Sequence, residues 1–94
     1  MTIGILTITL HIPACSSLKE KRRRLKPLIA RLRKEFNLSV AEMDHHDVWQ
    51  SAVIVCALVS NGQQHTQRSL QKTLQWVETN WPDVTVMDNQ FEIL

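Results

Sequence analysis

The chain has 94 residues, a formal net charge of +2 and an apolar fraction of 44%. This length suits one domain, residues 1–94, which can bury a core without a metal or disulfide bonds. The longest apolar run, residues 52–59, is too short to cross a bilayer, so we expect no membrane span.

The first predicted element is a strand from Thr2 to Ile12, where side chains alternate between two faces. No basic leader or cleavage site precedes it, so we expect no signal peptide and a cytoplasmic location. One face of the strand carries Leu6, Ile8, Leu10 and Ile12 and is predicted to lie in the core. The other face begins with Ile3 and ends with His11, which suits a sheet face partly covered by something else, such as a second subunit.

The next element, from Ser17 to Phe36, is predicted to be a basic amphipathic helix. Ser17 and Glu20 form a capping box at its start. Nine basic and two acidic residues give this stretch a charge of +7, so the rest of the chain carries −5. Pro27 should bend the helix around the core, because proline removes one backbone hydrogen bond. The predicted apolar stripe is Leu18, Leu25, Leu28, Ile29, Leu32 and Phe36.

Helical spacing directs five of these basic side chains, those at positions 19, 23, 26, 31 and 34, away from the stripe, while Lys21 and Arg22 flank it. An exposed row of cations can neutralise backbone phosphates without base contacts, so we expect a nucleic-acid-binding surface. The alternative is a solvated face that meets acidic residues of this chain or of a second subunit. The predicted binding residues are Lys19, Arg23, Lys26, Arg31 and Lys34, with Arg22 and Arg24 as secondary contacts.

The remaining elements complete an alternating order of strands and helices. Residues 37–44 and 48–60 are predicted to form a hairpin, and a cap at 60–63 starts a second helix that stops before Pro82. Residues 84–94 form a fourth strand, with a bulge or turn near Asp88. The order predicts an α+β, ferredoxin-like βαββαβ fold, with two helices on one face of a four-stranded antiparallel sheet and the first and third strands central.

The opposite face of such a sheet would be uncovered and apolar, so a homodimer through the sheet or its edge is expected.

The central strands carry no aromatic residue, which disfavours recognition of single-stranded RNA by stacking on the sheet and favours backbone or shape recognition. We interpret Trp49 as a half-buried hairpin residue that packs over the core, in preference to an exposed anchor.

One polar cluster could be a metal or acid/base site: Glu42, Asp44, His45, His46 and Asp47. No second ligand pair with matching spacing occurs, so we interpret it as a polar hairpin tip and predict no metal and no cofactor. The chain has only two glycines and none of the common nucleotide-binding or hydrolase motifs. We therefore expect no catalytic residues and a protein that is not an enzyme.

The two cysteines lack CxxC spacing, which fits a reduced compartment. Cys56 lies within an apolar run and is interpreted as a buried core thiol. Cys15 would precede a helix N-terminus, where thiols can be reactive. No histidine is fixed beside it by the sequence, so we assign it no catalytic role.

A His-x-Pro turn precedes Ser17-Leu18-Lys19-Glu20-Lys21-Arg22, and the further local motifs are Ser39-Val40-Ala41-Glu42, Asp44 with Asp47-x-Trp49-Gln50, and Val59-Ser60-Asn61. Together these motifs resemble the YlxP-like family of small bacterial proteins, a domain of unknown function, over Ile3 to about Val77. The resemblance implies a ferredoxin-like fold. Members are often encoded among translation and ribosome-maturation factors, which implies RNA or the ribosome as a partner.

Composition, fold and resemblance together predict an RNA- or ribosome-associated accessory protein that binds phosphates through its basic first helix. The alternative is a homo-oligomeric protein-interaction or small-ligand-sensing module that uses the open sheet face. The two differ in their response to salt, because only phosphate binding releases counterions from the nucleic acid.

Overall fold

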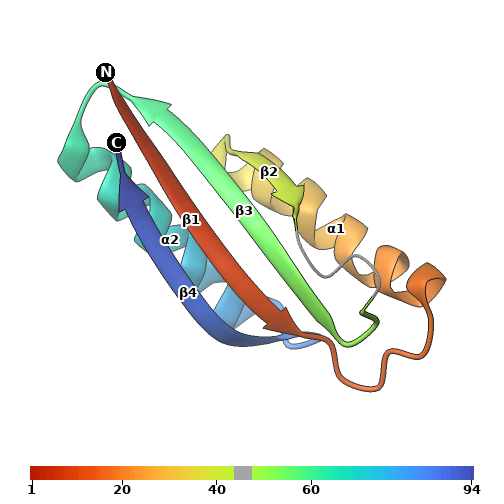
Figure 1. Ribbon diagram of the computed structural model, residues 1–94. Helices are drawn as coiled ribbons and strands as arrows, with labels where there is room; N and C mark the ends of the chain where they lie inside the picture. The colour runs from red at the N-terminus through yellow and green to blue at the C-terminus, as the bar shows by residue number, and fades with distance from the viewer. Residues whose placement is uncertain (44–47) are drawn as a thin grey trace.

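The computed structural model describes residues 1–43 and 48–94, in which strands and helices follow the order β-α-β-β-α-β (Figure 1). This order and the antiparallel sheet confirm the predicted ferredoxin-like α+β fold. The elements are β1 (Thr2–His11), α1 (Leu18–Phe36), β2 (Ser39–Glu42), β3 (Ser51–Ser60), α2 (Gln63–Asn80) and β4 (Thr85–Ile93).

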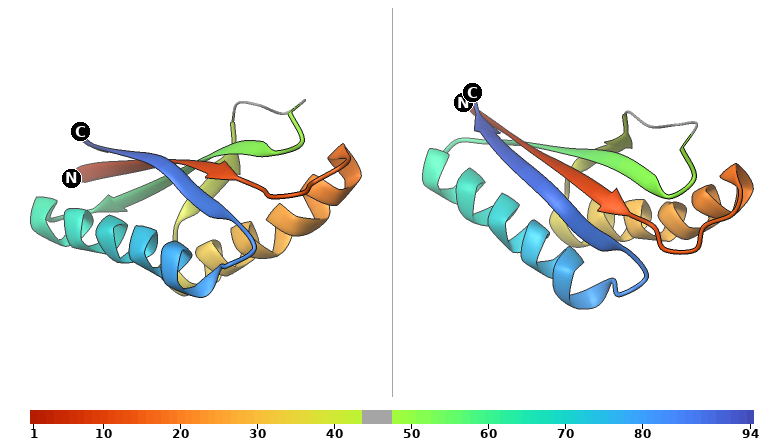
Figure 2. Two further views of the ribbon diagram at one scale, coloured as in Figure 1. Left: turned by 90° about the horizontal axis from the view of Figure 1, so that it is seen from below. Right: turned by 60° about the horizontal axis from the view of Figure 1, so that its bottom comes forward.

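The sheet has the strand order β2-β3-β1-β4, and each neighbouring pair is antiparallel. The central strands β1 and β3 pair along their whole lengths, from Thr2 opposite Ser60 to His11 opposite Ser51. Both helices lie on one face of the sheet (Figure 2). In the view of Figure 1, α1 lies beside β2 and α2 lies behind β1 and β4. The other face is uncovered in the described structure, as the sequence predicted.

The core lies between the sheet and the two helices. Alternate residues of β1 are at most 1% exposed, and the alternate residues of β3 facing the same way are buried beside them. Each large aliphatic side chain buried in this way stabilises the fold by roughly 1.5–3 kcal/mol. The core residues predicted from the sequence and found buried are Leu6, Ile8, Leu10, Ile12, Leu25, Leu28, Leu32 and Cys56. Leu70 and Val77 of α2 are buried as well.

Helix α1 starts and ends at identifiable caps. The hydroxyl of Ser17 accepts a hydrogen bond from the Glu20 backbone N–H at 3.0 Å, as predicted. The Glu20 carboxylate, however, accepts from the N–H and hydroxyl of Ser16, one residue earlier than a capping box requires, and these bonds lower the pKa of Glu20. The helix continues through Pro27 and ends at Asn37, which adopts the left-handed conformation with φ of 52°.

The hairpin strands β2 and β3 are shorter than predicted. Asn37 caps α1, so β2 begins only at Ser39. Gln50 lies in a turn, where its side chain donates to the Cys15 carbonyl and its own carbonyl accepts from the Ile12 N–H. Its neighbour Trp49 is 45% exposed and lies outside the core, so its interpretation as a core-covering residue was wrong.

The second half of the chain differs from the sequence prediction in one detail and agrees with it in another. Gly62 is the N-cap of α2 and has no side-chain cap; Ser60 instead bonds to the Gly62 backbone and to the Thr66 hydroxyl. The predicted irregularity in β4 is present as a shift in the register with β1, because Thr9 pairs with Asp88 whereas Leu10 pairs with Val86.

Within the described ranges neither helix combines the length and apolarity needed to cross a membrane.

Candidate nucleic-acid interface

The exposed side of α1 carries a set of cations that no other part of the described structure neutralises. Helical spacing turns them away from Leu25, Leu28 and Leu32, which face the core. Their side chains make no ion pair or hydrogen bond within residues 1–43 and 48–94. These free cations are Lys19, Arg22, Arg23, Lys26 and Lys34, all of which the sequence singled out.

Lys21 belongs to the same basic run but has a different environment. It does not flank the apolar stripe at the surface, because its side chain is only 2% exposed. Its Nζ atom lies 2.8 Å from Oε2 of Glu42, whose side chain is 22% exposed. The ion pair joins α1 to β2, and it compensates the cost of burying an ammonium group. No sequence pattern indicated this pair, since the two residues are far apart in the chain.

Arg24 binds the connection between α2 and β4 instead of facing solvent. Its guanidinium donates to the Asp83 carboxylate at 2.9 and 3.1 Å, to the Asp83 carbonyl at 2.7 Å and to the Pro13 carbonyl at 2.7 Å. The hydrogen bond to Asp83 raises the pKa of Arg24. The side chain is 14% exposed, so this predicted secondary contact is held by the fold itself.

Two further arginines of α1 are partly engaged. Arg31 lies 3.3 Å from the Glu35 carboxylate and 5.3 Å from the Trp76 ring centroid, a cation–π arrangement. Both members of the ion pair stay about half exposed, so Arg31 remains accessible to solvent. Arg33, which was not among the predicted binding residues, donates to the Val40 carbonyl of β2 at 2.7 Å. Arg33 therefore covers part of the edge of the sheet.

An open groove of about 370 Å³ runs along α1 towards β2. Arg22 and Glu42 also line a second, smaller hollow beside it, together with Leu18 and Lys21. The groove therefore lies among the basic side chains of α1, although its walls include apolar groups. The lining residues are Arg22, Leu25, Lys26, Ile29, Ala30, Arg33 and Glu42.

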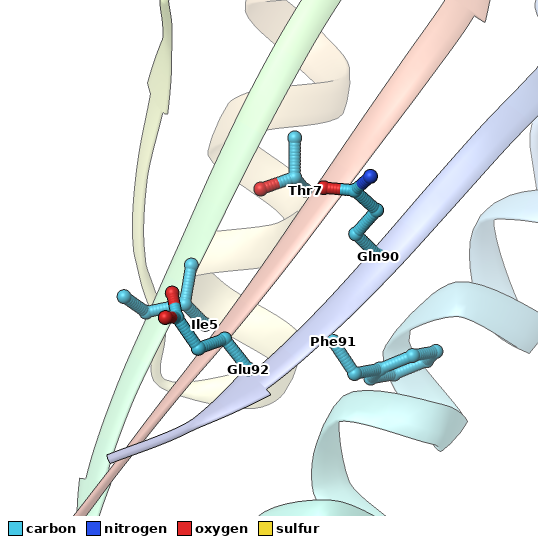
Figure 3. Close-up of a pocket in the computed structure, with 5 residues that line it drawn as sticks. All are labelled: Ile5, Thr7, Gln90, Phe91 and Glu92. Atoms are coloured by element: carbon cyan, nitrogen blue, oxygen red, sulfur yellow. The ribbon is translucent and has the colours of Figure 1, made fainter.

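The uncovered sheet face is chemically different. A hollow of about 450 Å³ lies over β1 and β4, with Ile5 and Thr7 beside Gln90 and Glu92 (Figure 3). Phe91 turns to the side of α2, because neighbouring residues of a strand face opposite ways. The carboxylate of Glu92 makes this face unsuited to phosphate, so the cations and this hollow are separate features.

The polar cluster that the sequence suggested falls largely outside the described residues. Only Glu42 of that cluster is described, and it pairs with Lys21. In the described ranges no three histidine, cysteine or acidic side chains lie together in a metal-binding arrangement.

Both cysteines are buried. Cys15 is 1% exposed, and its thiol donates to the Ser17 carbonyl. Cys56 is buried as predicted, and burial raises its pKa to about 12.

Comparison with known proteins supports the resemblance stated from the motifs. The chain is 33% identical, over 82 residues, to the uncharacterized protein YlxP of Bacillus subtilis (strain 168), and the match covers 87% of this chain and 88% of that protein. A model of the family described as protein of unknown function DUF503 matches residues 3–91. The chain therefore belongs to the DUF503 family, which confirms the resemblance to the YlxP-like family.

Proposed function

We propose that this protein is a non-enzymatic, RNA- or ribosome-associated accessory protein that binds phosphate backbone through the exposed side of α1. The observation that carries the proposal is the set of free cations on that side. Ion pairs inside the fold engage Lys21 and Arg24, but leave Lys19, Arg23 and Lys26 exposed. Such a row can neutralise several phosphates and release their counterions.

The rest of the molecule favours a specific orientation on RNA. Helix α2 carries only two cations, Arg68 and Lys72, and the uncovered sheet face carries Glu92. A polyanion is therefore attracted to α1 and repelled from the acidic part of the sheet. The proposed contacts need no base-specific hydrogen bond, because they are made by flexible side chains on a helix surface.

The test is binding of the purified protein to a structured RNA, titrated over salt concentration. We expect the logarithm of the binding constant to fall linearly with the logarithm of salt concentration, with a slope of about 0.7–0.9 per phosphate contacted. The variant Arg23→Glu/Lys26→Glu should lose most of this binding. The matched control is Arg68→Glu/Lys72→Glu, which makes the same charge change on exposed residues of α2.

The control separates a local surface from net charge. Equal losses in the two variants would mean that only the overall charge matters and would contradict the assignment to α1. Absence of binding to RNA near physiological salt would refute the proposed function. An acidic protein that binds equally well, with the same salt dependence, would also refute a preference for nucleic acid.

A second candidate function, the binding of a second copy through the sheet, is favoured by one observation. The uncovered face presents a band of aliphatic side chains on its central strands, and Val59 is 64% exposed. A band of this kind is typical of protein interfaces. Sedimentation of the protein and of Val55→Lys, which lies on this face opposite Thr7, tests it. A monomer at all concentrations would exclude it.

A further inference from the structure

The groove between α1 and β2 combines two properties that simple phosphate binding does not need. Its apolar part is formed by Leu25, Ile29 and Ala30, along one side of α1. Two arginines, Arg22 and Arg33, also line it. A surface that only neutralised phosphates would need the cations but no apolar hollow beside them.

We infer that this groove receives an unpaired base of the bound RNA, so that the ligand is single-stranded or looped RNA, not a duplex. The inference rests on the proposed function and names its substrate class. A nucleotide has a base with apolar faces attached to an anionic phosphate. The groove offers apolar contact with Lys26 and Arg22 within reach of the same ligand.

The arginines make the groove suitable for a base even though no aromatic side chain lines it. A guanidinium group is planar and stacks on a base face, as aromatic rings do. Ile29 and Ala30 provide apolar contact for the base. In the sequence of α1 they lie between Arg22 and Arg33, which are 11 residues apart. Every base has a π face, so this mode of binding tolerates many sequences.

The walls of the groove are held in place by contacts between α1 and β2. Lys21 pairs with Glu42 at 2.8 Å, and Arg33 donates to the Val40 carbonyl at 2.7 Å. These two contacts hold the edge strand against the helix. The volume of about 370 Å³ lies within the range of small-molecule sites. The site is therefore preorganised, which limits the entropy lost when a base enters.

Charge in the groove also determines how a nucleotide would be oriented. Strand β2 carries no Lys or Arg, and Glu42 at its end is paired with Lys21, so a phosphate is not attracted to this side of the groove. Lys26 lies on the exposed side of α1, next to the free cations Arg22 and Arg23. The phosphates therefore follow α1, while the base turns inwards to the apolar residues. In a duplex the bases are stacked and paired, so none of them can enter.

The test compares a single-stranded RNA oligonucleotide with the duplex formed with its complement. Wild-type protein should prefer the single strand by roughly tenfold, a typical value for one stacked base. Ala30→Leu fills the groove without changing charge, at an exposed helix position that tolerates leucine. It should weaken single-strand binding roughly tenfold and leave duplex binding unchanged. Gln75→Leu, at an exposed position of α2, is the matched control.

The outcomes separate this inference from the proposed function. Binding of both RNA forms with equal affinity, unaffected by Ala30→Leu, would overturn the inference and leave phosphate binding by α1 intact. No binding of either form would refute both. If an acidic amphipathic peptide binds wild type but not Ala30→Leu, while single-stranded RNA binds both equally, the groove is a site for protein and the inference is wrong.

Discussion

Lys21 and Glu42 connect the first turn of the basic helix to the edge strand β2 through a contact of 2.8 Å. Lys21 is followed directly by Arg22, Arg23 and Arg24. Yet Lys21 is buried, Arg22 and Arg23 are exposed, and Arg24 bonds to Asp83. Consecutive cations on a helix point in directions about 100° apart, so neighbours in sequence meet different surroundings.

The variant Lys21→Met should lower the free energy of unfolding by roughly 3 kcal/mol. It preserves most of the side-chain volume but removes the cation next to a carboxylate that is largely shielded from water. The expected loss is at the lower end for buried pairs, because Glu42 keeps some contact with solvent. Urea unfolding followed by tryptophan fluorescence measures it.

Lys26→Met is the control for the loss of a lysine from α1, because Lys26 is exposed and has no ion pair in the described structure. Its free energy of unfolding should change by no more than about 0.5 kcal/mol. The double variant Lys21→Met/Glu42→Leu should regain much of the lost stability, since neither charge is then left without the other. Equal stabilities of the two single variants would contradict a structural role for Lys21.

A second prediction concerns Arg24, whose guanidinium is used inside the fold. Arg24→Gln should leave the salt dependence of RNA binding nearly unchanged, because Asp83 already neutralises this cation. Arg23→Gln should lower the slope by about 0.7–0.9, the value for one lost phosphate contact. Salt titrations of both variants measure this difference. A larger effect from Arg24 than from Arg23 would show that the ion pair opens on binding.

The alternation in β1 and the spacing in α1 predicted the fold and most of the core, because both depend on short-range patterns of apolar residues. Leu6, Ile8 and Leu10 alternate, and Leu25, Leu28 and Leu32 recur at helical spacing. The same patterns fixed the order of elements, from which the antiparallel sheet follows. The bulge in β4 was also indicated, by the run of polar residues that starts at Asp88.

The candidate site could be predicted only in part, since its details depend on contacts between distant residues. The sequence indicated that α1 is basic, but Lys21–Glu42 and Arg24–Asp83 depend on how α1 meets β2 and the start of β4. Arg33 was overlooked as a site residue for the same reason, because its bond to the Val40 carbonyl requires β2 to lie beside the helix. Helical periodicity assigns a direction to each side chain, but not a partner.

Gly4 has a specific packing role that a third experiment can test. A Cβ atom added there would overlap the Thr66 methyl group and lie 2.8 Å from Leu70 Cδ1. Gly4→Ala should therefore lower the free energy of unfolding by roughly 1–3 kcal/mol, as expected for overpacking. Chemical denaturation measures the loss. Gly62→Ala is the control without overlap, because its added Cβ would meet nothing closer than His65 Cβ at 3.8 Å. Gly62 is the N-cap of α2, where alanine is less favourable than glycine, so this variant should lose less than about 1 kcal/mol. Equal losses in both variants would contradict the overlap.

Cys56 should make the stability of the protein fall at alkaline pH. Burial raises the pKa of its thiol from 9.0 to about 12, so the unfolded chain loses the thiol proton first as pH rises. The stability contributed by the protonated thiol is intact below pH 9 and is lost between about pH 9 and 12, at about 1.4 kcal/mol per pH unit. Denaturation of wild type and Cys56→Ala across this range measures the difference in slope, since the other titrating groups are common to both. Parallel pH profiles would contradict the raised pKa.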